Sequence, residues 1–386
     1  MERRYDIDWL RILAFALLIF YHTGMFFVPW GWHIKNPEIY DWLQTPMMFL
    51  NRWRMPLLFI ISGMGVAFSL KKRKTGNFIW ERIKMLLTPL IFGMLVVIPP
   101  QIYAERVVDG VFAGSYFQFW PSQLFVNGAY PEGNFSWHHL WFLPYILVFS
   151  LVLLPLFLLL KKYPEGRFMR LIHRLVSSPL KIYALTIPLI LLEVFVDPFF
   201  PVTHDLIHDW FYLLYNAVLF FYGFLFISAY PSFLKALQKG LRGFLLTGFI
   251  AYATFLFLRT FEDGWPRHIA EAVVNQISVL SWLLLFFALS ARYLNIKSKA
   301  VAYWNRAVYP FYILHQTVII LLAWWVMDAD WNLFFKFSFI SLACFLICWA
   351  LYEFIIKRFK LTRLFFGVRP SAPRVLWTRS GPGEKF

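Results

Sequence analysis

The chain has 386 residues, of which 60% are hydrophobic and only 15% are charged. Soluble domains are about half apolar and about a quarter charged, so this composition excludes a soluble globular protein and indicates a membrane protein. The formal net charge of +16 invites a nucleic-acid-binding interpretation. However, the Lys and Arg residues lie in short loops between apolar segments, where membrane insertion explains them, so no nucleic-acid partner is expected.

Apolar segments long enough to span a bilayer recur about ten times along the chain. The predicted fold is therefore an all-α integral membrane protein with about ten transmembrane helices. The third segment contains Pro89, Pro99 and Pro100, so a kink or a break is expected within it. In chain order, the expected spans cover residues 7–28, 45–70, 83–104, 138–160, 181–197, 210–230, 243–260, 269–291, 304–327 and 332–356.

Basic residues set the expected orientation, because they gather in alternate loops. Segments 71–84, 161–181, 235–242 and 292–306 are rich in Lys and Arg, whereas the intervening loops hold few: Lys35, Arg106, Arg259 and Arg267. Positively charged loops stay in the cytoplasm, so both termini are expected there. Residues 1–360 would form the membrane-embedded domain, and residues 361–386 a basic, disordered cytoplasmic tail.

The first span carries Asp8, Arg11 and His22 within apolar sequence. An ionisable side chain at membrane depth is costly, so it normally faces protein or water and is kept for a function. Arg11 and His22 are eleven positions apart, about three helical turns, and Asp8 lies about one turn before Arg11. The spacing predicts a stripe of acid, cation and imidazole on one helix face. The alternative is a structural salt bridge together with a histidine bonded to a neighbouring helix.

Two pairs of cations lie at the start of the next two spans. Arg52 and Arg54 open the second span, ahead of Ser62. Guanidinium groups at this depth are costly unless they face water, an anion or a carboxylate. Arg54 lies closer to the apolar run, which favours a function, whereas snorkelling to the outer headgroups explains Arg52 equally well. Arg82 and Lys84 enter the third span and suit the phosphate oxygens of a co-substrate.

Imidazoles recur in the later spans. His138 and His139 are adjacent and point to different helix faces, so at most one is expected to face a site, as a base or as a ligand of a sugar hydroxyl. His315 and Gln316 lie in an apolar run and are expected to face the bundle interior. The outer segment HDLIHD has the spacing of metal ligands, but its exposure favours a solvated loop. No metal site is expected, and two cysteines exclude a disulfide framework.

Four segments share a pattern across several spans: DWLRILAFALLIFYH, RMPLLFIISG, HLWFLPYILVFSLVLLP and YPFYILHQTV. Together they resemble membrane acyltransferase family 3, over about residues 5–360. That family includes O-acetyltransferases of bacterial surface polysaccharides and the succinyltransferase of periplasmic glucans. The resemblance implies that His22 is the essential first-helix histidine, that Arg11 is its paired arginine, and that Arg82 begins the third-helix motif linked to the acyl-CoA donor. The later arginine of that motif is absent before Pro89, so either Lys84 supplies the second contact or the donor pocket differs.

The resemblance and the residues together predict an O-acyltransferase of the bacterial inner membrane. It would transfer an acyl group, first acetyl and second succinyl, from cytoplasmic acyl-CoA to a hydroxyl of an extracytoplasmic glycan or glycolipid. Acyl-CoA would be a co-substrate rather than a permanently bound cofactor, and membrane lipids and a second copy of the chain are the other expected partners. The expected site residues are His22, Arg11 and Asp8 for catalysis, Arg82, Lys84 and Arg54 for the donor, and His138, His139, His315, Gln316, Ser62 and Arg52 near the acceptor or in support.

Two questions stay open at this level. His22 would act either as a general base or as a carrier of the acyl group. A transporter or flippase for a glycolipid or an anionic solute is the rival class, since buried charges and broken helices are typical there as well. Such a protein would show paired repeats, and none is evident in the sequence. A scaffold protein, in which His22 would be replaceable, is a third alternative.

Overall fold

The computed structural model describes residues 4–368. Within this range the regular structure is helical, apart from one isolated bridge between Ala129 and Phe135. Nine helical segments of this part of the chain are long and apolar enough to cross a membrane, and a bent pair of helices makes a tenth if it crosses as one span. The all-α membrane architecture is therefore confirmed, while the cytoplasmic placement of both termini stays a prediction.

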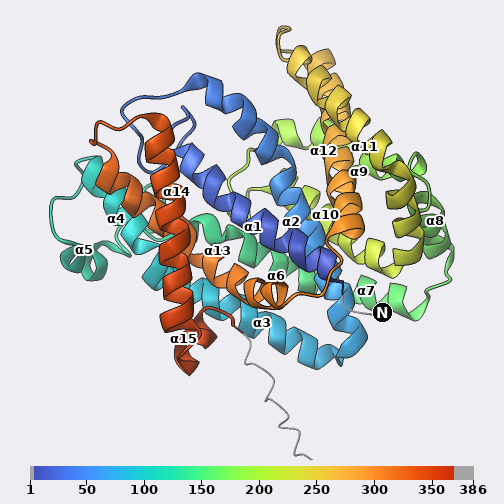
Figure 1. Cartoon of the computed structure of the whole chain (residues 1–386), viewed down its shortest axis with the longest axis horizontal. Helices are drawn as coiled ribbons and strands as arrows, with labels where there is room; N and C mark the ends of the chain where they lie inside the picture. Colours follow the sequence, from blue (N-terminus) through green and yellow to red (C-terminus); the bar gives the residue numbers. More distant parts are fainter. Residues whose placement is uncertain (1–3, 369–386) are drawn as a thin grey trace, which may run out of the picture.

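The first helix, α1 (Tyr5–Met25), lies at the centre of the molecule. In Figure 1 it runs in dark blue across the middle, between α2 (Gln44–Lys72) and α13 (Lys299–Val326). It also contacts α12 (Trp265–Tyr293) and α14 (Leu333–Ala350). Protein therefore surrounds much of α1, so polar side chains on its inner faces meet other helices rather than lipid.

A lysine side chain caps the C-terminal end of α1. Lys35 Nζ donates to the carbonyl oxygens of Met25 and Val28, at 2.7 and 2.6 Å. Carbonyls at a helix C-terminus lack intrahelical partners and carry partial negative charge, so a cation there is stabilising. Burial lowers the pKa of Lys35 to about 8. The contact fixes the loop that follows α1, and that loop carries part of the candidate site.

Two glycines let α2 and α10 (Trp210–Ser228) cross in backbone contact. A Cβ atom built on Gly63 would lie 1.8 Å from the carbonyl oxygen of Phe220, and one built on Gly223 would lie 1.9 Å from that of Ile60. Small residues at such crossings allow close helix packing in membranes. The crossing holds α2, and with it Arg54, at a fixed distance from the bundle core.

Two spans are interrupted. The third comprises α3 (Thr75–Phe92), a π-helical turn over Gly93–Val97 and α4 (Pro99–Val108). Its break precedes Pro99, whereas Pro89 stays inside α3. The fourth comprises α6 (Phe142–Val152) and α7 (Leu154–Lys162), bent by 46° within the span that was expected over 138–160. Pro155 lies in the first turn of α7, where its missing N–H cannot continue the α6 ladder.

The remaining helices complete the periphery. The helices α11 and α12 form a long hairpin at one side of the bundle (Figure 1). The bounds of the others are α5 Tyr116–Gln123, α8 Arg167–Val176, α9 Thr186–Phe195, α11 Tyr230–Leu258 and α15 Lys360–Phe365.

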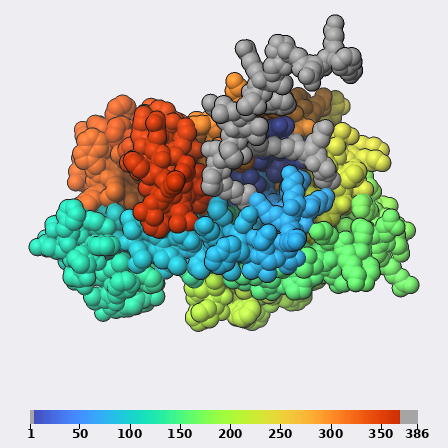
Figure 2. Space-filling view, turned by 90° about the horizontal axis from the view of Figure 1, so that it is seen from below, coloured from blue at the N-terminus to red at the C-terminus, as the bar shows by residue number. Residues whose placement is uncertain are grey.

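The ordered structure extends beyond residue 360, where the tail was expected to begin. Phe365 in α15 stacks on Phe92 of α3 with ring centroids 4.7 Å apart, and Phe366 is buried beside it. Figure 2 shows this red end of the chain against the blue and turquoise segments that follow α2. Aromatic packing on α3 explains why this basic stretch is ordered. The rest of the expected tail, residues 369–386, lies outside the described residues.

Candidate active site

A cavity of about 750 Å³ lies between α1, α2, α3 and α13. Its wall is basic at Arg4, near the start of α1, and aromatic at Phe15, further along the same helix. Phe15 lies eleven residues, about 16 Å of helix, beyond Arg4. Ser62 also lines it. The basic lining residues are Arg4, Arg11, Lys72, Arg73, Arg82 and Arg306. Such a wall suits a ligand with a phosphorylated head and a slender tail.

The predicted pair Asp8 and Arg11 lies in this wall. Arg11 Nη1 is 3.6 Å from Asp8 Oδ1 and donates to Asn305 Oδ1 at 3.1 Å. Asn305 Nδ2 in turn donates to Asp8 Oδ1 at 3.1 Å. Asn305 on α13 was not predicted, although an amide flanked by Trp304 and Arg306 in a membrane helix is a polar signal. Asp8 and Asn305 together hold the Arg11 guanidinium in the cavity wall.

The two cations expected for the donor differ in position. Arg82 lines the cavity, and its guanidinium carbon lies 5.2 Å from the ring centroid of Phe78. Lys84 is exposed and is absent from the cavity wall. The two residues are two positions apart on α3, about 200° around the helix, which explains why they face different surroundings. Of the two cations expected to bind the donor, Arg82 therefore lines the cavity and Lys84 does not.

An aromatic layer forms the inner end of the cavity. We use this name for Phe15, Phe142 and Tyr312, which are all lining residues. The ring centroids of Phe15 and Tyr312 are 5.4 Å apart, and those of Phe142 and Tyr312 are 6.1 Å apart. Tyr312 Oη donates to the carbonyl oxygen of His139 at 2.6 Å. The layer separates the cavity from a group of histidines that starts one turn further along α13.

His22 and His315 form the centre of that group. His22 Nδ1 lies 2.8 Å from His315 Nε2, and the two rings stack with centroids 4.9 Å apart. His315 Nδ1 lies 2.7 Å from the Tyr312 carbonyl oxygen and therefore carries the proton, because a carbonyl only accepts. In neutral rings, His315 Nε2 then accepts from His22 Nδ1–H. In this tautomer the lone pair of His22 Nε2 can accept a proton or attack a carbonyl carbon.

A buried cation lies close to the two histidines. Arg54 is 6% exposed, its guanidinium carbon lies 3.6 Å from the ring centroid of Tyr21, and its Nη2 donates to Asn51 Oδ1 at 3.2 Å. Within residues 4–368 its Nε has no hydrogen-bond partner and no carboxylate pairs with it. Burial and then the charge of Arg54 lower the pKa of His204 to about 4. A buried cation without a counter-ion is suited to a transient anion.

Arg52 belongs to a different part of the bundle. It donates to Asn275 Oδ1, and its guanidinium carbon lies 3.5 Å from the ring centroid of Phe255. Asn275 also donates to Glu193, at 2.8 Å. Arg52 and Arg54 are about 200° apart on α2, so they face opposite sides of that helix. The contacts of Arg52 therefore lie away from His22, although Arg52 was expected near the acceptor or in support of the site.

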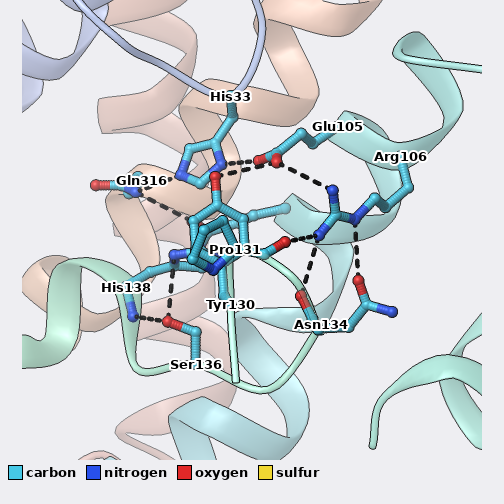
Figure 3. Close-up of polar contacts among 11 residues, drawn as sticks. His33, Glu105, Arg106, Tyr130, Pro131, Asn134, Ser136, His138 and Gln316 are labelled. Atoms are coloured by element: carbon cyan, nitrogen blue, oxygen red, sulfur yellow. Dashed lines mark hydrogen bonds and ion pairs between the residues drawn. The ribbon is translucent and has the colours of Figure 1, made fainter. Parts of the chain in front are cut away.

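A second polar cluster joins loop residues to Glu105 of α4 and Gln316 of α13 (Figure 3). His33 Nδ1 hydrogen-bonds to Glu105 Oε2, and Tyr130 Oη donates to Glu105 Oε1 at 3.1 Å. Gln316 Nε2 lies 3.4 Å from His33 Nε2, and the rings of His33 and His138 meet edge to face at 4.6 Å. The predicted residues Gln316 and His138 are thus brought together.

His33 and Glu105 were not assigned from the sequence. The available signal was a carboxylate at the end of an apolar span, with histidines in two neighbouring loops. That signal does not say which histidine pairs with Glu105, because His33 lies 72 positions away in the chain. His139, the other predicted imidazole, lies 3.0 Å from the Ile313 carbonyl oxygen through Nε2, and its Nδ1 has no partner in the described part of the chain.

Comparisons with known proteins show which family the chain belongs to. Curated proteins named Glucans biosynthesis protein C, from Salmonella typhi and Salmonella typhimurium, are 23% identical over 331 residues, which cover 81% of this chain and 82% of theirs. The protein of the same name from Salmonella paratyphi B is 23% identical over 327 residues. No solved structure matches the chain. The family described as "Acyltransferase domain" matches residues 4–353, nearly the whole length, and the chain therefore belongs to membrane acyltransferase family 3.

Proposed function

We propose that this protein takes an acyl group from cytoplasmic acyl-CoA and transfers it to a hydroxyl of an extracytoplasmic glycan or glycolipid, in the bacterial inner membrane. Acetyl is the first expected group and succinyl the second. One observation carries the proposal: a basic cavity and a histidine pair with a free Nε2 lie on opposite sides of one aromatic layer. The name of the relatives, Glucans biosynthesis protein C, supports a glucan as the acceptor.

The donor would bind with its phosphates among the basic residues of the cavity. Arg82 and Arg306 offer charge-assisted hydrogen bonds to phosphate oxygens from two different helices. The thioester end would then point along α1 toward the aromatic layer. Movement of Phe15 and Tyr312 would admit it to His22, which lies seven residues, about 10 Å of helix, beyond Phe15.

The chemistry rests on the orientation of His22. Acyl transfer to a hydroxyl needs a group that takes the proton or the acyl carbon, and positive charge near the carbonyl oxygen. His22 Nε2 supplies the first, because His315 holds the ring in the matching tautomer. Arg54 supplies the second, as a buried guanidinium with no carboxylate partner in the described range.

The test uses purified protein in lipid nanodiscs with acetyl-CoA and succinyl-CoA labelled in the acyl group. We expect release of CoA and transfer of label to short glucose oligomers, and loss of both in His22→Ala. His208→Ala is the matched control, since His208 is exposed and pairs with Asp205 on the molecular surface. No CoA release from either donor by folded protein would contradict the proposal and favour a transporter.

A further inference from the structure

The pair formed by His33 and Glu105 has the geometry of an oriented base. Glu105 Oε2 accepts from His33 Nδ1, since a carboxylate oxygen has no proton to give. The lone pair of His33 then sits on Nε2, and the amide nitrogen of Gln316 lies 3.4 Å from it, near the upper limit for a hydrogen bond. A carboxylate behind one imidazole nitrogen and a lone pair on the other is the arrangement that serves general bases.

The surroundings hold Glu105 firmly. Its second oxygen accepts from Tyr130 Oη at 3.1 Å, and burial followed by the charge of Glu105 raises the pKa of Tyr130 to about 12, so the phenol stays a donor. Arg106 donates to the carbonyl oxygen of Gly133 and to Asn134 Oδ1, both at 3.0 Å, which ties the loop bearing Tyr130 to α4 (Figure 3). Both carboxylate oxygens are thus used, and His33 has one orientation.

An unused donor lies beside this base. The ring of His138 meets that of His33 at 4.6 Å and that of Tyr130 at 4.7 Å. Ser136 Oγ accepts from the His138 backbone N–H at 3.0 Å, so its hydroxyl hydrogen is available to His138 Nδ1 at 3.4 Å. His138 Nε2 then carries a proton, yet it is buried and has no partner within the described residues. A buried donor of this kind is costly unless a ligand oxygen uses it.

The base also lies next to the acyl-transfer centre. Trp32 stacks on His22 with centroids 5.4 Å apart and meets His33 edge to face at 5.3 Å. The adjacent residues His315 and Gln316 contact His22 and His33, respectively. In the loop between α1 and α2, Gly31 is exposed and the side chain of His33 is 9% exposed. An acceptor hydroxyl bound at His33 would therefore lie close to His22 as well.

Once its Nε2 carries the acyl group, His22 has no nitrogen left to receive the acceptor proton. The Nδ1 of His22 is used by His315, and Arg54 has no lone pair. We infer that His33, oriented by Glu105, is a second base that takes the proton of the acceptor hydroxyl, and that His138 binds the same acceptor. The inference rests on the proposed function, and it assigns the carrier role to His22.

The proposed reaction has two steps, acylation of His22 and transfer of the acyl group to the acceptor. His22 Nε2 attacks the thioester carbonyl carbon, a C–N bond forms, the C–S bond breaks and CoA leaves as thiolate, while the Nδ1 proton of His22 passes to His315 Nε2. The acceptor oxygen then attacks the acyl carbon, a C–O bond forms, the C–N bond breaks and the hydroxyl proton passes to His33 Nε2. His315 returns its proton to His22, and His33 releases its proton to water.

The experiment separates these steps with His33→Gln in nanodiscs, using labelled acetyl-CoA and short glucose oligomers. In a single turnover we expect a burst of CoA release and label retained on His22, detected by peptide mass spectrometry. Transfer to the oligomers should fall about 100-fold or more, as for loss of a general base. Transfer at the parental rate would overturn the inference, as would loss of the CoA burst together with transfer, because His33 would then act on the donor.

Glu105 is a positioning residue, so its variants need a different readout. We expect Glu105→Gln to lower kcat for oligomer transfer with an unchanged KM for acetyl-CoA, and Glu105→Asp to restore part of kcat. An increase in the KM for acetyl-CoA with kcat unchanged would contradict this role. His208→Ala, which removes an exposed histidine–carboxylate pair, should behave as the parent does. A parent protein without any CoA release would count against the proposed function instead, so the two failures are distinct.

Discussion

Single residues of the same type have different surroundings in this bundle, and the two arginines of α2 show it. Arg54 is buried against the amide of Asn51 and the ring of Tyr21, whereas Arg52 shares Asn275 with Glu193. A buried charge without a counter-ion destabilises a fold, but a charge that neutralises a carboxylate supports it. The two residues are therefore expected to respond oppositely to the same substitution.

We expect Arg54→Met to reduce acyl transfer about 100-fold, the typical loss when one oxyanion donor is removed, with an unchanged or higher thermal midpoint. Arg52→Met, the matched variant, should lower the thermal midpoint because it removes the cation that is joined to the half-buried Glu193 through Asn275. Transfer rates and light-scattering melts of both variants in nanodiscs make the comparison. A normal rate in Arg54→Met would remove Arg54 from the chemistry.

The donor cations give a second residue-scale test. We expect Arg82→Ala to raise the KM for acyl-CoA about 10-fold, because it removes a charge-assisted contact from the cavity wall. Lys84→Ala should leave the KM within about 2-fold, since that side chain is exposed and outside the cavity wall. Initial rates at varied acyl-CoA concentration measure both. The reverse ranking would mean that the donor binds on another face of α3.

Candidate residues within one helix were open to prediction, and contacts between helices were not. The spacing of Asp8, Arg11 and His22 is fixed by helical geometry, so their common face followed from the sequence. The partner of His22 is 293 positions away, and that of His33 is 72 positions away. Helical periodicity carries no information about such pairs, because they depend on how α1, α4 and α13 pack. His33 and Glu105 were missed for this reason.

At the scale of elements, the crossing of α2 and α10 is the most demanding contact. We expect Gly63→Ala to destabilise the protein by about 1–3 kcal/mol or more, because its new methyl would lie 1.8 Å from a backbone oxygen and the helices would have to separate. Gly243→Ala in α11 is the control, since nothing lies within 4 Å of its Cβ position. That variant should be neutral or slightly stabilising, as alanine favours helix.

Thermal melts of Gly63→Ala and Gly243→Ala test whether the crossing of α2 and α10 needs a glycine. Equal midpoints would show that α2 and α10 do not touch through their backbones, and that Arg54 is not held by this crossing.

Hydropathy located the helices but not their ends or breaks. The span expected over 243–260 belongs to a helix that begins at Tyr230 and ends at Leu258, because backbone hydrogen bonding continues through the basic residues before the apolar run. The break of the third span was expected from its prolines, but Pro89 is accommodated within α3. The bend after α6 was not expected, although Pro155 marks its position. The length of an apolar segment indicates how much of the bilayer a helix can cross, whereas the ends of the helix depend on local hydrogen-bond partners of the backbone.

At the scale of the whole molecule, the orientation in the membrane is open to direct measurement. Cys344 and Cys348 are buried, so a background with both replaced by alanine allows single-cysteine labelling. We expect a cysteine at Lys74 to be protected from a membrane-impermeant maleimide in intact cells, and a cysteine at Thr203 to react, because basic loops stay in the cytoplasm. The opposite pattern would place the basic cavity outside the cell and rule out cytoplasmic acyl-CoA as its ligand.

The aromatic layer between the cavity and the histidines has a consequence for the cell as a whole. A protein with a continuous wet path from one side of the bilayer to the other would leak protons and drain the gradient that drives ATP synthesis. Phe15, Phe142 and Tyr312 interrupt that path with three packed rings. In a bilayer they would act as an electrical insulator, and the proposed transfer requires this insulator to open for a thin uncharged chain while it stays closed to ions.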